Sequence, residues 1–349
     1  MRVLLLGADG FIGRRVTDRL LMDQELQVTV LGRRDSADIR FDLTTGSPGA
    51  LARFLDAVAP QVVINCAGAT YGSSRTLIRS NTLAVATVCE AIRRSREPAR
   101  LVHVGSAAEY GPVPGGVPVS EQAEPRPVGP YGVSKLAGTE LVLASGLDAA
   151  VLRVFDVVGP GAPTASLFGR LAEGLRRALE RDENQVRMPD LSGYRDFVDV
   201  RDVARAIQAA AVSAATGVIN VGSGHAVRAR DAAQLLVRAS GFEGSIVEEN
   251  RQVLLPAQLA GAGSDHLPGH HLPGHHLPGH HQPGHHQPGQ HLPGHRPEGH
   301  RPEGRAVPGE PVPWRQADVR TARDRLGWRT QVPLEESLGD VWLETACRV

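Results

Sequence analysis

Short apolar runs alternate with longer amphipathic stretches over the first 155 residues of the chain. Continuous apolar runs are typical of strands buried in a parallel sheet, and they predict strands at residues 3–6, 27–31, 61–65 and 99–104. The amphipathic stretches predict a helix that ends near Met22, further helices at residues 49–59 and 76–96, and one that begins at Tyr131. This alternation predicts an α/β fold with a doubly wound, mostly parallel sheet and right-handed crossovers.

The pattern becomes less regular after residue 155. It predicts a strand at 218–221 and helices at residues 164–181, 202–212, 229–240, 318–326 and 334–344. We therefore expect residues 1–155 to form the main domain. Residues 156–255 and 306–349 should form a smaller C-terminal, substrate-binding lobe, with some elements returning to the main sheet.

An insert at residues 256–305 interrupts this pattern. From His266 to Arg305 the sequence repeats every five residues, as in HLPGH, and the repeat holds twelve of the 14 histidines. Proline and glycine in every repeat oppose helix and sheet, so a disordered or loosely extended insert is predicted. Paired imidazoles can chelate a divalent metal. A flexible tract pre-forms no coordination geometry, however, so we favour a tolerated repeat expansion and assign no metal site.

Composition limits the classes of function. The formal net charge is +0, which does not suggest a binder of nucleic acid or of membrane surfaces. Three cysteines without paired spacing fit a reducing compartment. No segment approaches the ~18 apolar residues of a membrane span, and the first apolar run is too short for a signal peptide. We therefore expect a cytoplasmic globular protein.

Three glycines, Gly7, Gly10 and Gly13, lie between the first strand and the first helix, with Phe11 and Ile12 among them. This spacing permits a tight turn and lets a pyrophosphate approach the backbone at the N-terminus of the helix. The sequence therefore predicts a dinucleotide site. A glycine-rich turn without a ligand is the alternative.

Two arginines, Arg33 and Arg34, follow the second strand. An acidic residue there would bind the ribose 2′-hydroxyl of NAD(H), whereas arginines accommodate the 2′-phosphate of NADP(H). We therefore expect NADP(H) to be preferred over NAD(H), although ordinary solvated charge would give the same pattern. Asp42 and Leu43 fall where a contact to adenine is expected. Small residues at 67–68 (AG) would let a cofactor lie against the backbone at the end of a strand.

Lys135 is the only lysine in a chain with 38 lysines and arginines. It follows Tyr131 by four residues, so both side chains can lie on one face of a helix. A neighbouring ammonium favours phenolate, and we expect the pKa of Tyr131 to be lowered from ~10. Ser106 should lie at the carboxyl end of a central strand, where open α/β sheets bind ligands. A surface tyrosine and a solvated lysine are the alternative interpretation.

Eight short segments occur in order along the chain: GADGFIG (7–13), NCAG (65–68), GSAAEYG (105–111), YGVSK (131–135), RVFDVVGPG (153–161), RDFVDVRDV (195–203), INVGSG (219–224) and LGW (326–328). Together they resemble the extended short-chain dehydrogenase/reductases, the NAD-dependent epimerase/dehydratase family, which have a Rossmann-type fold. Their order and spacing carry the resemblance, which covers nearly all of the chain except the histidine insert.

The resemblance implies roles for individual residues. It implies that Tyr131 is the general acid/base, that Lys135 lowers the tyrosine pKa and binds the nicotinamide ribose, and that Ser106 hydrogen-bonds the reacting oxygen. Arg195 would contact the substrate diphosphate, and Asp156 lies near the substrate phosphates. The implied cofactor contacts are Gly7, Gly10, Phe11, Ile12, Gly13, Arg33, Arg34, Asp42, Leu43, Ala67, Gly68, Asn81, Tyr131, Lys135, Phe155 and Val158.

Departures from the family pattern narrow the chemistry. The related 4,6-dehydratases have an Asp-Glu pair directly after the position of Ser106, but this chain has Ala107 and Ala108 there. Glu109 is one position out of register and should point away. Most relatives have Asn at the position of Asp156, and a carboxylate there would repel a diphosphate unless an arginine intervenes. The late diphosphate arginine of the family has no clean equivalent, since Arg305 and Arg315 bracket its position.

The leading hypothesis is an NADP(H)-dependent reductase of a keto group on a nucleotide-activated deoxysugar. Hydride would come from the nicotinamide and the proton from Tyr131. A nucleotide-sugar 4-epimerase with tightly bound NAD(H) is the alternative. A non-catalytic NADP(H)-sensing protein is a third hypothesis. The resemblance also implies a homodimer. The sequence specifies neither the sugar nor the nucleotide.

Overall fold

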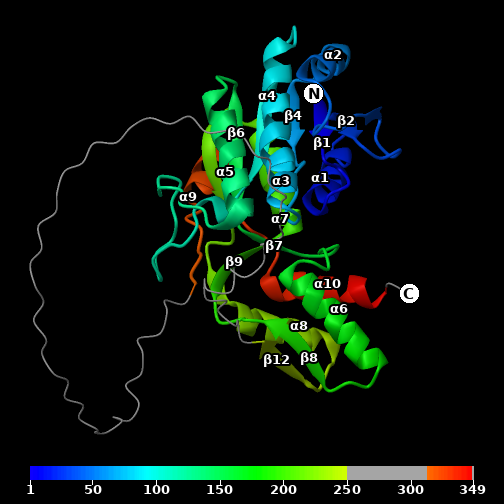
Figure 1. Ribbon diagram of the computed structural model, residues 1–349, viewed down its shortest axis with the longest axis vertical. Helices are drawn as coiled ribbons and strands as arrows, with labels where there is room; N and C mark the ends of the chain where they lie inside the picture. The colour runs from blue at the N-terminus through cyan, green and yellow to red at the C-terminus, as the bar shows by residue number, and fades with distance from the viewer. Residues whose placement is uncertain (250–312, 348–349) are drawn as a thin grey trace, which may run out of the picture. The chain divides into compact units, whose positions relative to one another are not determined.

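A seven-stranded parallel sheet forms the centre of the protein (Figure 1). The computed structural model describes residues 1–249 and 313–347, and the predicted histidine insert lies outside them. The strand order is β10-β6-β5-β4-β1-β2-β3. The strands are β1 (Arg2–Leu6), β2 (Gln27–Gly32), β3 (Ile39–Arg40), β4 (Val62–Asn65), β5 (Arg100–Ser106), β6 (Ala149–Val154) and β10 (Gly217–Val221). The predicted doubly wound α/β fold is confirmed.

Helices cover both faces of this sheet. Successive residues of a strand point to opposite faces, so Val3 and Leu5 pack into one core while Leu4 and Leu6 pack into the other. The first core also takes side chains from α1 (Phe11–Leu21), α7 (Val200–Val212) and α9 (Arg320–Leu326). The second takes them from α2 (Pro48–Val58), α4 (Ala84–Arg94) and α5 (Gly129–Ala144). Apolar residues on both faces explain why these strands are continuous apolar runs in the sequence.

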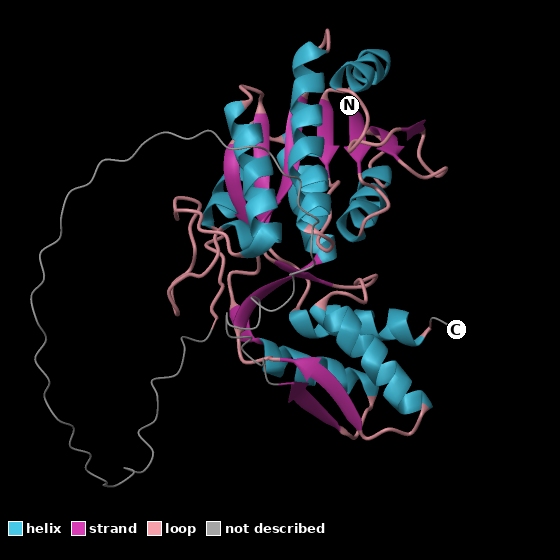
Figure 2. Cartoon of the chain, viewed as in Figure 1, coloured by secondary structure: helices cyan, strands magenta, loops and turns pink. Residues whose placement is uncertain are grey.

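A smaller group of helices and strands lies below the main sheet in Figure 2. Its buried side chains form a core of their own. It contains α6 (Leu167–Glu180), α8 (Ala229–Ser240), α10 (Leu334–Ala346) and the parallel pair β8 (Gln185–Pro189) and β12 (Ser245–Glu249). A three-stranded sheet, β11-β9-β7, comprises β7 (Asp156–Val158), β9 (Tyr194–Asp199) and β11 (Ala226–Arg228). The division of the chain at residue 155 stays a prediction. The main sheet takes β10 from beyond that position.

The single helix predicted over residues 76–96 is wrong at one place. The structure has α3 (Ser74–Ile78), a π-helical turn at Arg79–Leu83 and then α4. A Cβ atom on Gly138 of α5 would lie 2.2 Å from the Asn81 carbonyl oxygen, so the two helices pack closely at this turn. The Asn81 amide donates to the Ala69 carbonyl (2.8 Å) and to the Ser134 hydroxyl (3.0 Å). Such turns are frequent at functional sites.

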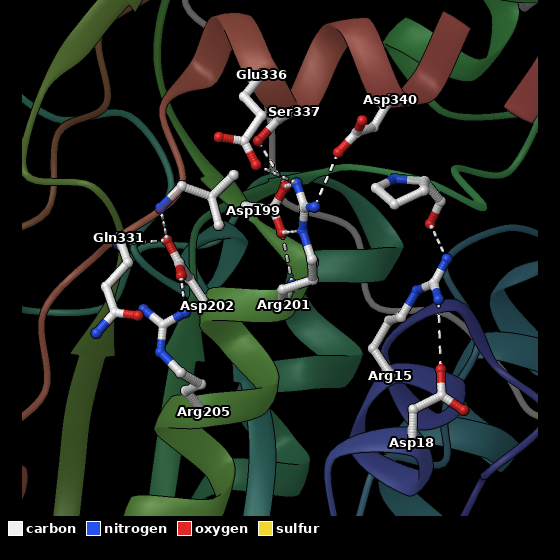
Figure 3. A network of polar contacts seen from close by, with 12 residues as sticks. Arg15, Asp18, Asp199, Arg201, Asp202, Arg205, Gln331, Glu336, Ser337 and Asp340 are labelled. Atoms are coloured by element: carbon white, nitrogen blue, oxygen red, sulfur yellow. Dashed lines mark hydrogen bonds and ion pairs between the residues drawn. The ribbon is translucent and has the colours of Figure 1, made fainter. Parts of the chain in front are cut away.

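Buried carboxylates of the RDFVDVRDV segment join the C-terminal part of the chain to the rest (Figure 3). Asp199 caps α7 and accepts hydrogen bonds from Ser337 (2.5 Å) and from the Arg201 guanidinium (2.9 Å). Arg201 also pairs with Asp340 at 2.8 Å. The Asp202 carboxylate accepts the backbone N–H groups of residues 331 and 332. This motif therefore anchors α10 against the start of α7.

Candidate active site

A cavity of about 500 Å³ lies at the carboxyl ends of β1, β4 and β5. This is the edge of an open α/β sheet at which ligands bind. The cavity brings together eleven of the residues predicted from the sequence. They are Gly10, Phe11, Ile12, Ala67, Gly68, Asn81, Ser106, Tyr131, Lys135, Phe155 and Asp156.

The glycine turn at one end of the cavity is built for close backbone approach. Gly7 has φ +81°, and a Cβ atom on Gly13 would lie 2.0 Å from the Gly7 carbonyl oxygen. Gly10 caps α1 without any side-chain hydrogen bond to the first turn. The first N–H groups of a helix have no partner within the helix, and here they lie beside the cavity wall formed by Gly10, Phe11 and Ile12. This cradle fits the pyrophosphate of a dinucleotide cofactor.

The residues predicted to bind the adenosine part of the cofactor lie away from this cavity. A neighbouring cavity of about 320 Å³ shares Phe11 with it and includes Asp9 and Ser36. Arg34 is largely exposed, and its Nε atom lies 3.7 Å from an Asp9 carboxylate oxygen. Asp42 accepts hydrogen bonds from the backbone N–H and hydroxyl of Thr44. Gly7, Gly13, Arg33, Arg34, Asp42 and Leu43 do not line the larger cavity.

Tyr131, Ser106 and Lys135 all line the larger cavity. Ser106 ends β5, and Tyr131 lies in the first turn of α5. Both hydroxyl groups line the cavity, and the Ser106 side chain is close enough to the Tyr131 phenol to favour its phenolate form. The Lys135 ammonium is buried and donates to the Val104 carbonyl at 2.6 Å. The arrangement can hold a carbonyl oxygen of a ligand between two hydroxyl groups.

The expected lowering of the Tyr131 pKa is wrong for the protein without a ligand. The pKa is raised, chiefly because burial penalises the phenolate, and the charges of Glu109 and Asp156 add to this effect. The nearby Ser106 side chain opposes it. Burial also lowers the pKa of Lys135. Tyr131 is therefore a phenol at neutral pH, which suits a proton donor rather than a base.

Glu109 lies beneath the site and does not line the cavity. Its carboxylate accepts the Ser106 backbone N–H at 2.8 Å and pairs with the buried Arg153 at 2.7 Å. A Cβ atom on Gly105 would lie 2.9 Å from the Glu109 carboxylate, so glycine makes room for this contact. Glu109 thus fixes the backbone that presents Ser106, instead of acting on a ligand.

A buried histidine supports the end of β4. The Asn65 amide lies 3.2 Å from His103 Nδ1, and the Ala67 N–H donates to the Asn65 amide oxygen at 3.0 Å. His103 is fully buried. Burial holds the pKa of His103 well below its usual value, with a further contribution from the charge of Lys135. His103 is therefore neutral at physiological pH and acts as part of the scaffold.

Charged residues gather at the opposite end of the cavity. Asp156 pairs with Arg195 at 3.3 Å and with Arg315 at 3.5 Å. Arg315 lines the main cavity, while Arg195 and Val158 line an adjoining one of about 150 Å³ that shares Asp156. The sequence alone did not decide whether Arg305 or Arg315 is the second arginine expected to bind the diphosphate. Arg315 belongs to this site, and Arg305 lies outside the described residues.

Cys66 and Tyr71 are among the residues of the cavity wall that were not predicted as site residues. Cys66 follows β4, and burial raises the pKa of its thiol to about 12. Tyr71 lies in the next loop, and its hydroxyl donates to the Ala165 carbonyl at 2.8 Å, across to the segment before α6. The small-residue motif at 65–68 pointed to Cys66, but no local signal pointed to Tyr71.

Residues 1–249 and 313–347 contain no group of three or more histidine, cysteine, aspartate or glutamate side chains that could hold a metal ion. No helix in the same ranges combines the length and the apolar character needed to cross a membrane.

Comparison with known proteins reveals relatives along the whole chain. Residues 3–222 match the NAD dependent epimerase/dehydratase family. The chain is 33% identical to dTDP-6-deoxy-L-talose 4-dehydrogenase (NAD(P)(+)) of Kitasatospora kifunensis, over 98% of this chain and 94% of that enzyme. It is 28% identical to UDP-glucose 4-epimerase of Azospirillum brasilense, over 76% and 85% of the two chains. The solved structure of RMD from Pseudomonas aeruginosa, complexed with NADPH, shares the fold, with a TM-score of 0.73, 21% identity and 99% of both chains covered.

Proposed function

This chain belongs to the NAD dependent epimerase/dehydratase family, and we propose that it reduces a keto group of a nucleotide-activated deoxysugar. It is an enzyme of the extended short-chain dehydrogenase/reductase type, and the family resemblance predicted from its motifs is confirmed. One observation carries the proposal. The cavity that carries the dinucleotide cradle also holds Tyr131, Ser106 and Arg315, and Arg195 lines the adjoining cavity.

Each end of the cavity has a task in this reaction. The bound nicotinamide supplies the hydride. Ser106 and Tyr131 orient the carbonyl oxygen, and Tyr131 delivers a proton to it. Arg195 and Arg315 bind the diphosphate through charge-assisted hydrogen bonds. Ala107 and Ala108 offer no acid or base for dehydration.

The relative with 33% identity is named for a 4-dehydrogenase of a dTDP-linked 6-deoxysugar. The first substrates to test are therefore dTDP-linked 4-keto-6-deoxyhexoses, followed by their UDP and GDP counterparts. We expect consumption of one NADPH for each sugar reduced, measured together by absorbance and mass spectrometry. No oxidation of reduced cofactor with any of these substrates would refute the proposal.

A 4-epimerase is the second candidate, because it uses the same three side chains and a UDP-glucose 4-epimerase is among the relatives. An epimerase returns the hydride to the same sugar and consumes no cofactor. Purified protein that carries tightly bound NAD and interconverts 4-epimers without added NADPH would favour this function.

We propose that NADP(H) is preferred over NAD(H). Arg33 and Arg34 at the end of β2 can pair with a 2′-phosphate. The exposed Arg34 would have to leave Asp9 to do so. We expect tighter binding of NADPH than of NADH by fluorescence titration. The double substitution Arg33→Ser and Arg34→Ser should remove this difference and leave NADH binding unchanged.

We also propose a homodimer in the cytoplasm, without a nucleic-acid partner. Apolar side chains are exposed on neighbouring helical segments, at Ile78, Leu83, Val133 and Leu141. An apolar face of this kind is typical of a helix–helix interface. Sedimentation should give a dimer, and Leu83→Glu should give a monomer. A monomeric wild type would contradict this.

A further inference from the structure

Asp156 lies between the two arginines of the proposed diphosphate site. Its carboxylate oxygens lie 3.3 Å from Arg195 Nη1 and 3.5 Å from Arg315 Nη1. All three side chains line the main cavity or the smaller cavity that adjoins it. A negative side chain therefore already occupies the position between two cations where an anionic ligand would bind.

The two arginines are held in place by β9. Arg195 belongs to β9, and the Arg315 backbone N–H donates to the Tyr194 carbonyl at 3.0 Å. Two residues later, the Ala317 N–H donates to the buried Asp196 carboxylate at 2.9 Å. The Tyr194 and Trp314 rings contact each other in a tilted arrangement, with centroids 5.0 Å apart. The convergence of the two guanidinium groups therefore follows from fixed backbone positions.

Asp156 forms only weak ion pairs with these two arginines. Both contacts are longer than the ~2.8 Å of a good charge-assisted hydrogen bond. The oxygen that faces Arg315 is buried and accepts no hydrogen bond from the described residues. Arg195 is 43% exposed and Arg315 is 32% exposed, so solvent weakens the attraction. A diphosphate offers more oxygens and more charge, and it can displace the carboxylate.

We propose that Asp156 competes internally with the substrate diphosphate for Arg195 and Arg315. The inference rests on the proposed function. In the free protein Asp156 neutralises part of the positive charge of the site. When the nucleoside diphosphate moiety binds, it takes over both arginines and leaves Asp156 beside it, so like-charge repulsion persists in the complex. Asp156 therefore keeps the affinity below the value that the two arginines alone would give.

The test is the affinity of the full-length protein for dTDP, UDP and GDP, measured by calorimetry with NADPH present. We expect Asp156→Asn to bind the preferred nucleotide about tenfold more tightly than wild type, which corresponds to about 1.4 kcal/mol. The gain should shrink as salt is raised, because it is electrostatic. Asp156→Glu keeps the charge and should resemble wild type. Glu180→Gln makes the same change in net charge on the exposed end of α6 and should change nothing.

Asp156→Ser gives a second way to remove the charge and should show the same gain. Equal or weaker binding by both neutral variants would overturn the inference and leave the proposed function standing. Weaker binding would mean that the carboxylate accepts a hydrogen bond from the ligand. If neither wild type nor the neutral variants bind any of the three nucleotides, the proposed function falls together with the inference.

Discussion

The two ends of the cavity are built in different ways. At the cofactor end the ligand would contact the backbone. Glycines there have no side chains, so a ligand can approach the N-terminus of α1. The substrate end is made of charged side chains from β7, β9 and the segment after residue 312. The glycine turn comes from one continuous stretch of sequence, whereas the substrate end is assembled only by folding. Substitutions at the cofactor end should therefore impair cofactor binding, and substitutions at the substrate end should impair nucleotide binding.

Tyr131 lies where the two ends meet, and its loss should have the largest effect. Tyr131→Phe removes the proton donor and keeps the ring, so kcat for keto reduction should fall by about 10³-fold. The dissociation constants of NADPH and of the nucleotide should both stay unchanged. Steady-state kinetics and titration of the same preparation measure these quantities. A variant that keeps more than a tenth of the wild-type kcat would assign proton transfer to another group.

A substitution in the glycine turn should impair cofactor binding. A Cβ atom on Gly13 would overlap the Gly7 carbonyl, so Gly13→Ala must displace the turn. We expect NADPH binding to weaken by about 10²-fold, as for other ~1 Å displacements in a site. Gly339→Ala in α10 is the control, because a Cβ atom there meets nothing within 4 Å. Unchanged NADPH affinity in Gly13→Ala would refute the account of the cofactor end.

Loss of an arginine at the substrate end should weaken nucleotide binding and leave cofactor binding unchanged. Arg315→Met removes one charge-assisted contact, and the affinity for nucleoside diphosphate should fall about 10- to 100-fold. NADPH binding should not change. Arg320→Met, in the same segment but exposed and paired with Asp318, is the matched control. Equal losses in both variants would show that the effect comes from the segment and not from the site.

The smallest effect concerns the scaffold of the cofactor end. His103 is held neutral in the folded protein, whereas an unfolded histidine takes up a proton near pH 6.5. The unfolded state then binds more protons, so the free energy of unfolding should fall as pH decreases below 6.5, by about 1.4 kcal/mol per pH unit. Denaturant titrations between pH 7 and 5.5 measure this slope. His103→Gln should flatten it, and parallel curves for variant and wild type would contradict the assignment.

The sequence predicted the parts of this fold that are encoded locally. The strands of the main sheet are apolar on both faces, and the glycine turn is a short motif between a strand and a helix, so both were recognisable. The π-helical turn was not, because it depends on the approach of Gly138 to Asn81 from another helix. Strands β8 and β12 were missed, since their burial alternates within a few residues beside a helix-rich region.

The electrostatics of the site could also not be predicted where they depend on residues that are distant in sequence. The spacing of Tyr131 and Lys135 was read correctly as one face of a helix, yet the pKa of Tyr131 moves in the opposite direction. The Lys135 ammonium is bound to a carbonyl of β5, and two carboxylates distant in sequence act on the phenol. Asp156 was recognised as unfavourable for a diphosphate. Its partner in the free protein, Arg315, could not be identified from the sequence, because folding brings it in from more than 150 residues away.

Hydride transfer from the cofactor to the sugar is the central claim, and isotopic labelling tests it most directly. The enzyme would be given NADPH that carries deuterium at the transferable position, together with a dTDP-linked 4-keto-6-deoxyhexose. We predict one deuterium on the former carbonyl carbon of the product for each NADPH oxidised, and transfer slowed by about 10³-fold in Tyr131→Phe. A keto sugar that stays unreduced while NADPH remains unchanged would contradict the account. Interconversion of the corresponding 4-hydroxy nucleotide sugar with its 4-epimer, without uptake of deuterium, would identify an epimerase.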